Sequence, residues 1–332
     1  MRNGKVVAFP TETVYGLGAN ALDEAAVQKI YQVKGRPSDN PLIVHLANVC
    51  EIDKYAEISE TAHKIIEFFM PAPLTVVLKK KDIISGVITG RCDTVAIRVP
   101  KDSVARKLIE LAGVPIAAPS ANLSGRPSPT SAKHVIAELN GKIDAILCGN
   151  DCEIGLESTV IAFDDCGKVR ILRSGAITEE MLIAVMGEEN ILRGLNELKD
   201  EHDIPQSPGM KYTHYSPDAP LYILIGEDIL IAEFIKEKSR KNSQKIGFLC
   251  YNEIADEIRE HTENKNCENL KIMSLGGKNN LDEQARNLFN ALNIFNETGV
   301  DVIYAAEPTR TGIGEAIYNR LEKASGGKSI IL

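Results

Sequence analysis

The chain has 332 residues, a net charge of −8, 44% hydrophobic and 25% charged residues, and no tryptophan, a composition typical of a soluble globular protein and not of a disordered or fibrous one. At roughly 150 residues per domain, this length predicts two domains. We expect no membrane span, because no run of about 18 apolar residues occurs, and the start "MRNGKVVAFP" lacks the apolar segment of a signal peptide, which favours the cytoplasm.

The cysteines and the charge distribution exclude further classes. Seven cysteines form no CxxC pair, and their odd number argues against a disulfide framework or a zinc ribbon. Residues 1–217 carry 24 basic and 28 acidic side chains, and residues 218–332 carry 14 and 18. Each part therefore has a charge of −4, and neither indicates a nucleic-acid-binding surface.

Short β-branched runs alternate with amphipathic stretches up to about residue 186. The runs predict strands at 5–9, 42–46, 74–80, 94–99, 115–119, 145–148, 158–163 and 169–173. The amphipathic stretches predict helices at 23–34, 59–70, 103–112, 131–140 and 178–186, with N-caps at Asp23, Ser59 and Ser103 and stops at Gly113, Gly141 and Gly187. Several strands follow one another without a helix, so we expect an open, twisted, mixed α/β sheet.

The pattern changes near residue 188. Residues 188–220 are rich in charge and then in Pro, Gly, Ser and Tyr, which indicates a linker. Strand runs at 221–226, 245–251, 270–276 and 300–306 then alternate with helices, which include 282–297 and 313–324. This predicts a smaller, mostly parallel, Rossmann-like domain, and the predicted limits are 1–187, 188–220 and 221–332.

Two glycine motifs are weak signals for nucleotide binding. "GLGANA" at residues 16–21 lies between a strand and a helix as a dinucleotide fingerprint would, but six residues separate the strand from the first glycine. "SGGKS" near the end lacks the first glycine of a phosphate-binding loop, because position 322 is Glu322, and we interpret it as a tail.

Three other stretches indicate an anionic ligand. Lys34 and Arg36 stand in a turn stiffened by two prolines, although cations at a helix C-terminus also oppose the helix dipole. Arg98 shares the inner face of a core strand with Thr94 and Ala96, where it needs an anionic partner or a wet cavity.

The third stretch, "AAPSANLSGRPSPT" at residues 117–130, has two readings of equal weight. Its small polar side chains could serve turns, or they could surround a phosphate. Ser158 and Arg173 add polar groups at the ends of other strands.

"FPTETVYGLG", "KGRPSDNPLIVHL", "VAIRVP", "APSANLSG" and "ESTV", in this order, resemble the YrdC-like domain of threonylcarbamoyl-AMP synthases. "SPGMKYTHYSP" and the Rossmann-like tail resemble the longer, two-domain form of that family. The chain departs from the family in having only "MRNG" before its first strand, where members usually carry a helix.

The resemblance implies an enzyme that makes threonylcarbamoyl-AMP and pyrophosphate from ATP, L-threonine and bicarbonate or CO2, for later modification of tRNA adenosine by other proteins. It implies a Lys-x-Arg and Ser-x-Asn signature at Lys34, Arg36, Ser120 and Asn122. It implies threonine binding by Thr13, His45, Arg98, Ala118 and Ser158. It implies ATP binding by Arg36, Asn40, Thr94, Ser120, Ser128, Arg173 and Tyr215.

Magnesium is expected to arrive with the triphosphate, because the motifs contain no acidic cluster that would form a metal site. Residues 207–217 are expected to act as a lid over the nucleotide. An RNA-binding module with the same fold but no adenylate chemistry is the alternative, and the negative charge argues against it.

Overall fold

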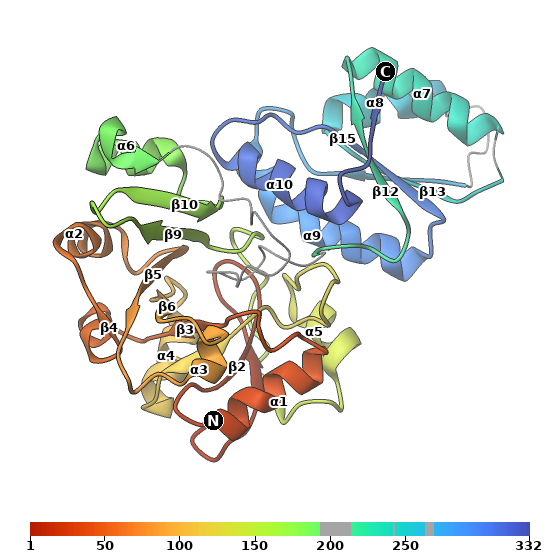
Figure 1. Cartoon of the computed structure of the whole chain (residues 1–332). Helices are drawn as coiled ribbons and strands as arrows, with labels where there is room; N and C mark the ends of the chain where they lie inside the picture. The colour runs from red at the N-terminus through yellow and green to blue at the C-terminus, as the bar shows by residue number, and fades with distance from the viewer. Residues whose placement is uncertain (193–213, 242, 263–268) are drawn as a thin grey trace. The chain divides into compact units, whose positions relative to one another are not determined.

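The computed structural model describes residues 1–192, 214–241, 243–262 and 269–332 (Figure 1). The chain divides into two compact units. The first unit contains Met1–Ser124 and the described residues from Ser128 to 192. The second contains Gly125–Pro127 and the described residues from 214 onward.

The first unit is built on an eleven-stranded mixed sheet. Its strands are β1 (Val7–Phe9), β2 (Gly16–Asn20), β3 (Ile43–His45), β4 (Ala56–Glu57), β5 (Leu74–Lys80), β6 (Thr94–Arg98), β7 (Ile116–Ala118), β8 (Ala145–Ile146), β9 (Thr159–Phe163), β10 (Val169–Arg173) and β11 (Ile191–Leu192). The spatial order is β11-β10-β9-β5-β6-β3-β7-β2-β1-β8, and β4 pairs with β5. The sheet is mixed as predicted, because β3 runs parallel to β6 but antiparallel to β7.

The helices of the first unit are α1 (Glu24–Lys34), α2 (Glu60–Phe69), α3 (Gly86–Thr89), α4 (Ser103–Ala112), α5 (Ala132–Leu139) and α6 (Glu179–Met186), with 3-10 turns η1 (Val49–Lys54) and η2 (Glu188–Asn190). The Asp23 and Ser59 side chains cap α1 and α2 as predicted. The prediction of Ser103 as the cap of α4 is wrong: Asp102 accepts the Ala105 N–H at 2.7 Å. The carboxylate one residue earlier already occupies the capping position.

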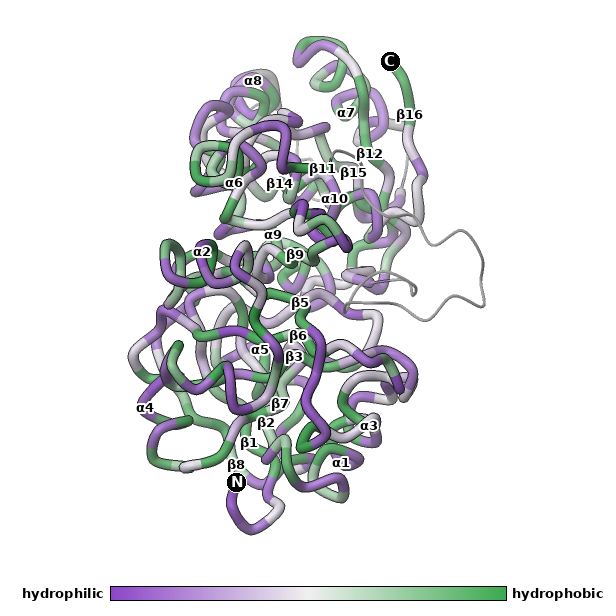
Figure 2. The backbone as a smooth tube through the Cα atoms, turned by 60° about the vertical axis from the view of Figure 1, so that its left-hand side comes forward, coloured by the Kyte–Doolittle hydropathy of each residue, from purple (hydrophilic) through white to green (hydrophobic). Residues whose placement is uncertain are grey.

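The two faces of this sheet differ. Residues paired directly across neighbouring strands point to the same face. One face carries Val44, Val76, Val95, Ile97, Ala117 and Ile161, which belong to a large core with buried residues of α1, α2 and α5. Figure 2 shows hydrophobic stretches of the chain along β3, β5 and β6, the strands that carry most of these residues.

The opposite face carries a small apolar cluster and polar side chains. The cluster consists of Ile43, Val77, Ala96, Val160, Ala162 and Leu172. The strand register places His45 and Arg98 next to it, because His45 pairs with Arg98 and Ile43 pairs with Ala96. Toward β1, Ala105 and Ile109 of α4 cover this face. We call it the polar face of the sheet.

The stretch "GLGANA" does not form a dinucleotide-binding turn. Gly16–Asn20 is strand β2, antiparallel to β1. The Phe9 ring lies against its glycines: a Cβ on Gly18 would stand 2.7 Å from both the Phe9 ring and Ile116. The glycines therefore make room for an aromatic ring, whose edge in turn meets His45 at a centroid distance of 6.3 Å.

The second unit has a parallel sheet with helices on both faces. Its strands are β12 (Leu221–Ile225), β13 (Ile246–Cys250), β14 (Leu270–Ser274), β15 (Val302–Ala306) and β16 (Ser329–Ile331), in the order β14-β13-β15-β12-β16. The helices are α7 (Asp228–Lys241), α8 (Asn252–Thr262), α9 (Leu281–Thr298) and α10 (Ile313–Ser325). Figure 1 shows α7 and α8 on one side of the strands and α9 and α10 on the other.

The second unit confirms the predicted Rossmann-like class but corrects its edge. Four strands were predicted, and the described residues contain five, every described pair being parallel. The stretch interpreted as a tail leads into β16, which begins at Ser329 and pairs with β12. Three residues at a chain end are too short for a periodic signal, so pairing with the neighbouring strand decides their conformation. None of the described helices is both long enough and apolar enough to cross a lipid bilayer.

Candidate active site

Arg98 lies at the end of β6 on the polar face and is 4% exposed. Its Nη1 donates to Thr13 Oγ1 at 2.8 Å, and its Nη2 lies 2.7 Å from Glu12 Oε1. The Thr11 hydroxyl donates to the Val14 carbonyl at 2.6 Å, so the Thr13 hydroxyl must donate to Thr11 Oγ1 at 2.8 Å. Each proton in this chain of hydroxyls has an acceptor, and the guanidinium is held at two of its nitrogens.

One edge of this guanidinium remains without hydrogen bonds. Neither Nε nor Nη2 of Arg98 has a hydrogen-bonded acceptor among the described residues, although Nη2 is close enough to Glu12 to form an ion pair. Buried donors are almost always satisfied in proteins. An unsatisfied guanidinium edge therefore indicates an absent acceptor, and a carboxylate matches the spacing of its two N–H groups.

Glu12 is a site residue that the sequence did not reveal. It is 4% exposed, and its carboxylate also accepts the N–H groups of Lys101 and Asp102 at 3.0 and 3.3 Å. Burial alone would raise the pKa of the Glu12 carboxyl, but the Arg98 charge and the backbone N–H of Lys101 hold that pKa below its ordinary value. The only signal in the sequence was a polar "TET" between two apolar runs.

His45 lies beside Arg98 on the neighbouring strand. It is 4% exposed, and its Nδ1 lies 3.1 Å from the Ile43 carbonyl oxygen, so this nitrogen carries the proton. Burial and then the Arg98 charge lower the pKa of His45 to about 3. The imidazole is therefore neutral at physiological pH and adds no second positive charge beside the guanidinium.

Lys34 ends α1 with its ammonium group inside the protein. The side chain is 3% exposed, and Nζ donates to the Ser120 carbonyl at 2.6 Å and to the Asn122 carbonyl. Burial, followed by the Arg36 charge, places the pKa of Lys34 well below its ordinary value. The structure thus joins the two predicted signature segments, because the Lys-x-Arg lysine holds the backbone of the Ser-x-Asn loop.

The turn after α1 is fixed by hydrogen bonds as well as by its two prolines. Gly35 adopts a left-handed conformation (φ 61°), and the N–H groups of Gly35 and Arg36 return to the carbonyls of Gln32 and Tyr31, which is a Schellman motif. Arg36 Nη2 then donates to Asn40 Oδ1 at 2.6 Å and to the Pro41 carbonyl at 2.9 Å. The turn therefore brings Arg36 and Asn40 together, and their assignment to ATP stays a prediction.

A third buried cation, after Arg98 and Lys34, stands at the end of β10. Arg173 is 6% exposed, and its Nε and Nη2 donate to the Ser158 carbonyl and hydroxyl at 3.0 and 3.1 Å. The Ser158 hydroxyl also lies 2.8 Å from Thr75 Oγ1. The shift in register between Ile171 and Arg173 turns this arginine toward the polar face. Thr75, a lone hydroxyl in an apolar strand, was not predicted.

The other predicted residues lie as follows. Ala118 and Thr94 are on the polar face, paired with Ile43 and Lys79. Ser120 follows β7, and its backbone forms a bridge with Gly16. Ser128 is buried and hydrogen-bonded to Glu157, another acidic group that was not predicted.

Tyr215 belongs to the second unit. Its ring packs against Phe289 at a centroid distance of 5.2 Å, and its backbone has a positive φ of 67°. Its predicted contact with ATP stays a prediction. Most of the predicted lid lies outside the described residues, which resume at 214.

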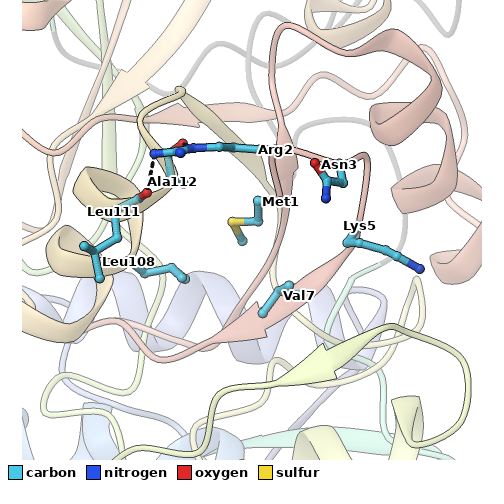
Figure 3. A pocket seen from close by; sticks show the side chains of 8 residues that line it. All are labelled: Met1, Arg2, Asn3, Lys5, Val7, Leu108, Leu111 and Ala112. Carbon is cyan, nitrogen blue, oxygen red and sulfur yellow. Dashed lines mark hydrogen bonds between the residues drawn. The ribbon is translucent and has the colours of Figure 1, made fainter.

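A separate pocket of about 450 Å³ lies between the chain start and α4 (Figure 3). Arg2 borders it and donates to the carbonyls of Leu111 and Ala112 at 2.7 and 2.5 Å, which satisfies the end of α4. None of the predicted site residues lines this pocket. Among the described residues, no group of three or more His, Cys, Asp or Glu side chains gathers where a metal ion could bind.

Comparison with known proteins identifies the chain. Residues 1–175 match a family model described as "Telomere recombination", and residues 177–326 match one described as "Threonylcarbamoyl-AMP synthase, C-terminal domain". The threonylcarbamoyl-AMP synthase of Pyrococcus abyssi is 45% identical over 99% of this chain and 93% of its own length. The chain belongs to the threonylcarbamoyl-AMP synthase family. The Bacillus subtilis member is also 45% identical, over 99% of this chain and 92% of its own length.

Solved structures of this synthase family agree with the fold. Pyrococcus abyssi Sua5 in complex with L-threonine has a TM-score of 0.89 and 43% identity, and the match covers 100% of this chain and 93% of that one. A doubly substituted variant of the same protein gives the same score and identity, over 92% of its chain. The predicted family, two-domain α/β fold and class of enzyme are confirmed.

Proposed function

We propose that this chain forms threonylcarbamoyl-AMP and pyrophosphate from ATP, L-threonine and bicarbonate or CO2. The observation that carries the proposal is the buried edge of Arg98, which has Nε and Nη2 without hydrogen-bonded acceptors among the described residues. This edge fits the carboxylate of an amino acid. Membership of the synthase family supports threonine as that amino acid.

The threonine subsite extends from Arg98 along the polar face. His45 beside Arg98 is neutral, so it does not repel the amino group of the substrate. Thr75 and Arg173 position the Ser158 hydroxyl. Ala118 offers a small apolar surface. The residues assigned to threonine are Thr13, His45, Arg98, Ala118 and Ser158.

The nucleotide subsite draws on the turn after α1 and on the Ser-x-Asn loop that Lys34 holds. ATP enters as its magnesium complex, and cationic and hydroxyl groups balance the phosphate charge. Lys34, Arg36, Ser120 and Asn122 surround the reacting groups. The residues of the first unit assigned to ATP are Arg36, Asn40, Thr94, Ser120, Ser128 and Arg173.

The chemistry requires no covalent bond to the protein. The threonine nitrogen uses its electron pair to bond the carbon of CO2, one C=O π pair moves onto oxygen, and the nitrogen loses a proton to solvent, which gives a carbamate. A carbamate oxygen then attacks the α-phosphorus, and the bond from that phosphorus to the bridging oxygen breaks, so that pyrophosphate leaves with the electron pair. Positioning and charge stabilisation are what the protein must supply. Transfer of the threonylcarbamoyl group to tRNA adenosine would follow on other proteins.

The test is a pyrophosphate-release assay with ATP and bicarbonate, with and without threonine. We expect release only when threonine is present, and threonylcarbamoyl-AMP as the accompanying product. A chain that bound RNA but released no pyrophosphate in response to threonine would overturn the proposal and favour the RNA-binding alternative. A second arm uses Arg98→Lys, which loses the two parallel N–H groups of the guanidinium. This variant should raise the KM for threonine about tenfold or more and change the KM for ATP little. Equal effects on both substrates would contradict the assignment of Arg98.

A further inference from the structure

Glu12 contacts the guanidinium of Arg98 at Nη2, one of the two nitrogens of the edge that lacks hydrogen bonds. Its Oε1 lies 2.7 Å from Arg98 Nη2, and both side chains are almost fully buried, at 3% and 5% exposure. The same carboxylate accepts the N–H groups of Lys101 and Asp102, which connect β6 to α4. One buried carboxylate thus joins the arginine to the start of the helix that follows it.

We propose that Glu12 is the positioning residue of Arg98, and that by fixing the guanidinium plane it makes the site selective for a substrate carboxylate. This inference rests on the proposed function, since it takes threonine as the ligand of Arg98. Glu12 touches no substrate in this role. It acts through Arg98 alone.

The hydrogen-bonding capacity of arginine supports this assignment. A guanidinium has five N–H donors in a rigid plane. Thr13 holds Nη1, and Glu12 attracts Nη2, so the plane is fixed by two partners. Nη2 carries two N–H groups, so one can face Glu12 while the other, together with the Nε N–H, is left for a ligand. With only Thr13 as a partner, the guanidinium plane could rotate about the hydrogen bond from Nη1 to Thr13. The N–H groups at Nε and Nη2 would then no longer point in one fixed direction.

The surroundings of Glu12 show that it is itself fixed. The two backbone N–H groups prevent its carboxylate from following Arg98 toward a ligand. The pair of Glu12 and Arg98 is neutral, so a substrate carboxylate gains little from net charge here. Selectivity for that carboxylate then depends on the direction of the N–H groups, which is what Glu12 controls.

The test compares Glu12→Gln with the wild type by titration calorimetry, using L-threonine and L-threoninamide, which lacks the carboxylate. The amide oxygen of the variant can still accept from Lys101, but it carries no negative charge, so Arg98 loses its ion pair and its guanidinium is held less firmly. We expect the preference for threonine over threoninamide to fall about tenfold or more, with ATP affinity within about twofold of wild type. The matched control is Asp144→Asn. Like Glu12, Asp144 pairs with a cation, here Lys5, and accepts a backbone N–H, here that of Val6.

The outcomes separate a positioning role from a structural one. Equal weakening of threonine, threoninamide and ATP in Glu12→Gln, together with a lowered Tm, would overturn the inference. If Glu12→Gln does not fold, Glu12→Asp keeps the charge but shortens the side chain by one methylene. An intermediate loss of the threonine preference is then expected, and an unchanged preference would overturn the inference.

Arg98→Lys distinguishes this inference from the proposed function. If Arg98→Lys keeps the wild-type preference for threonine, the assignment of Arg98 to the carboxylate fails, and the role of Glu12 fails with it. If Arg98→Lys loses the preference but Glu12→Gln keeps it, only the inference about Glu12 is wrong. A variant with both substitutions should bind threonine no more weakly than Arg98→Lys alone.

Discussion

The sheets of the two units bury charge to different extents. In the described part of the first unit, the buried charged side chains are Glu12, Lys34, Arg98, Glu157 and Arg173. In the described part of the second unit, only Arg320 is both charged and buried. Its parallel sheet is covered by apolar helix faces on both sides, with a core that includes Phe248, Ile254 and Phe289.

This difference shows which unit carries the destabilising buried charges that a functional site requires. A buried charge costs several kcal/mol unless it is paired and hydrogen-bonded. The first unit accepts this cost on one face of its sheet and builds an ordinary apolar core on the other. The second unit has no comparable polar face among its described residues, so substitutions of charge should matter much more in the first unit.

The largest effect is expected for Lys34→Ala, which removes the cation that holds the Ser-x-Asn loop. Threonine-dependent pyrophosphate release should fall by two orders of magnitude or more, because an electrostatic group in a water-poor site contributes about 3 to 4 kcal/mol to the barrier. Lys29→Ala is the control, since Lys29 lies on the same helix and donates to a carbonyl from an exposed position. Comparable rates for the two variants would contradict this role of Lys34.

The next effect concerns pH and His45. Its folded pKa of about 3 lies below the unfolded value of 6.5, so unfolding takes up a proton in this window. The resulting stability is complete above pH 6.5 and is lost as the pH falls, by about 1.4 kcal/mol per pH unit until the folded pKa is reached. Urea-unfolding midpoints from about pH 8 to about pH 5 should therefore fall less steeply for His45→Asn than for the wild type.

His63→Asn is the matched control for this measurement, because His63 is an exposed histidine on α2. Its midpoints should follow those of the wild type. If His45→Asn and the wild type lose stability in parallel between pH 6.5 and about pH 5, another group is responsible for the loss.

A smaller effect is expected where the apolar packing supports the polar face. Gly18→Ala places a methyl group 2.7 Å from both the Phe9 ring and Ile116. Overpacking of this kind costs about 1 to 3 kcal/mol, and the free energy of unfolding measures it. Gly141→Ala has open space around its Cβ, so it reports only the cost of a positive φ. A Gly18 variant as stable as the wild type would mean that Phe9 can move away from β2.

The smallest effect is expected for an ion pair of the second unit. Lys278 and Asp228 lie 2.6 Å apart, with side chains 44% and 40% exposed. Because exposed pairs contribute about 0 to 1 kcal/mol, Lys278→Ala should hardly change the thermal midpoint. A loss of clearly more than about 1 kcal/mol would show that exposure does not explain the difference between the two units.

The sequence predicted most of the regular structure for identifiable reasons. The strand at 74–80 and the strand at 169–173 were predicted with their observed bounds, because β-branched runs between turn residues are a strong signal. It failed at β2 and β16, where glycines and a short chain end hide a strand, and at β4 and β11, which are only two residues long. Of the site, the motif residues Arg98 and Lys34 were found, whereas Glu12 and Thr75 were not, because their partners lie 86 and 83 positions away in the chain.

By itself, the sequence determined the family, the two-domain α/β class and the chemical types of the site residues, because these depend on local patterns and on motif order. Only the tertiary structure decided which of these groups meet. Strand register placed His45 beside Arg98 and put both on the face away from the main core. The end of α1 brought Lys34 to the Ser120 carbonyl, and the turn before β2 brought Glu12 to Arg98. Such contacts depend on how distant strands pair, and no local pattern in a single chain specifies that pairing.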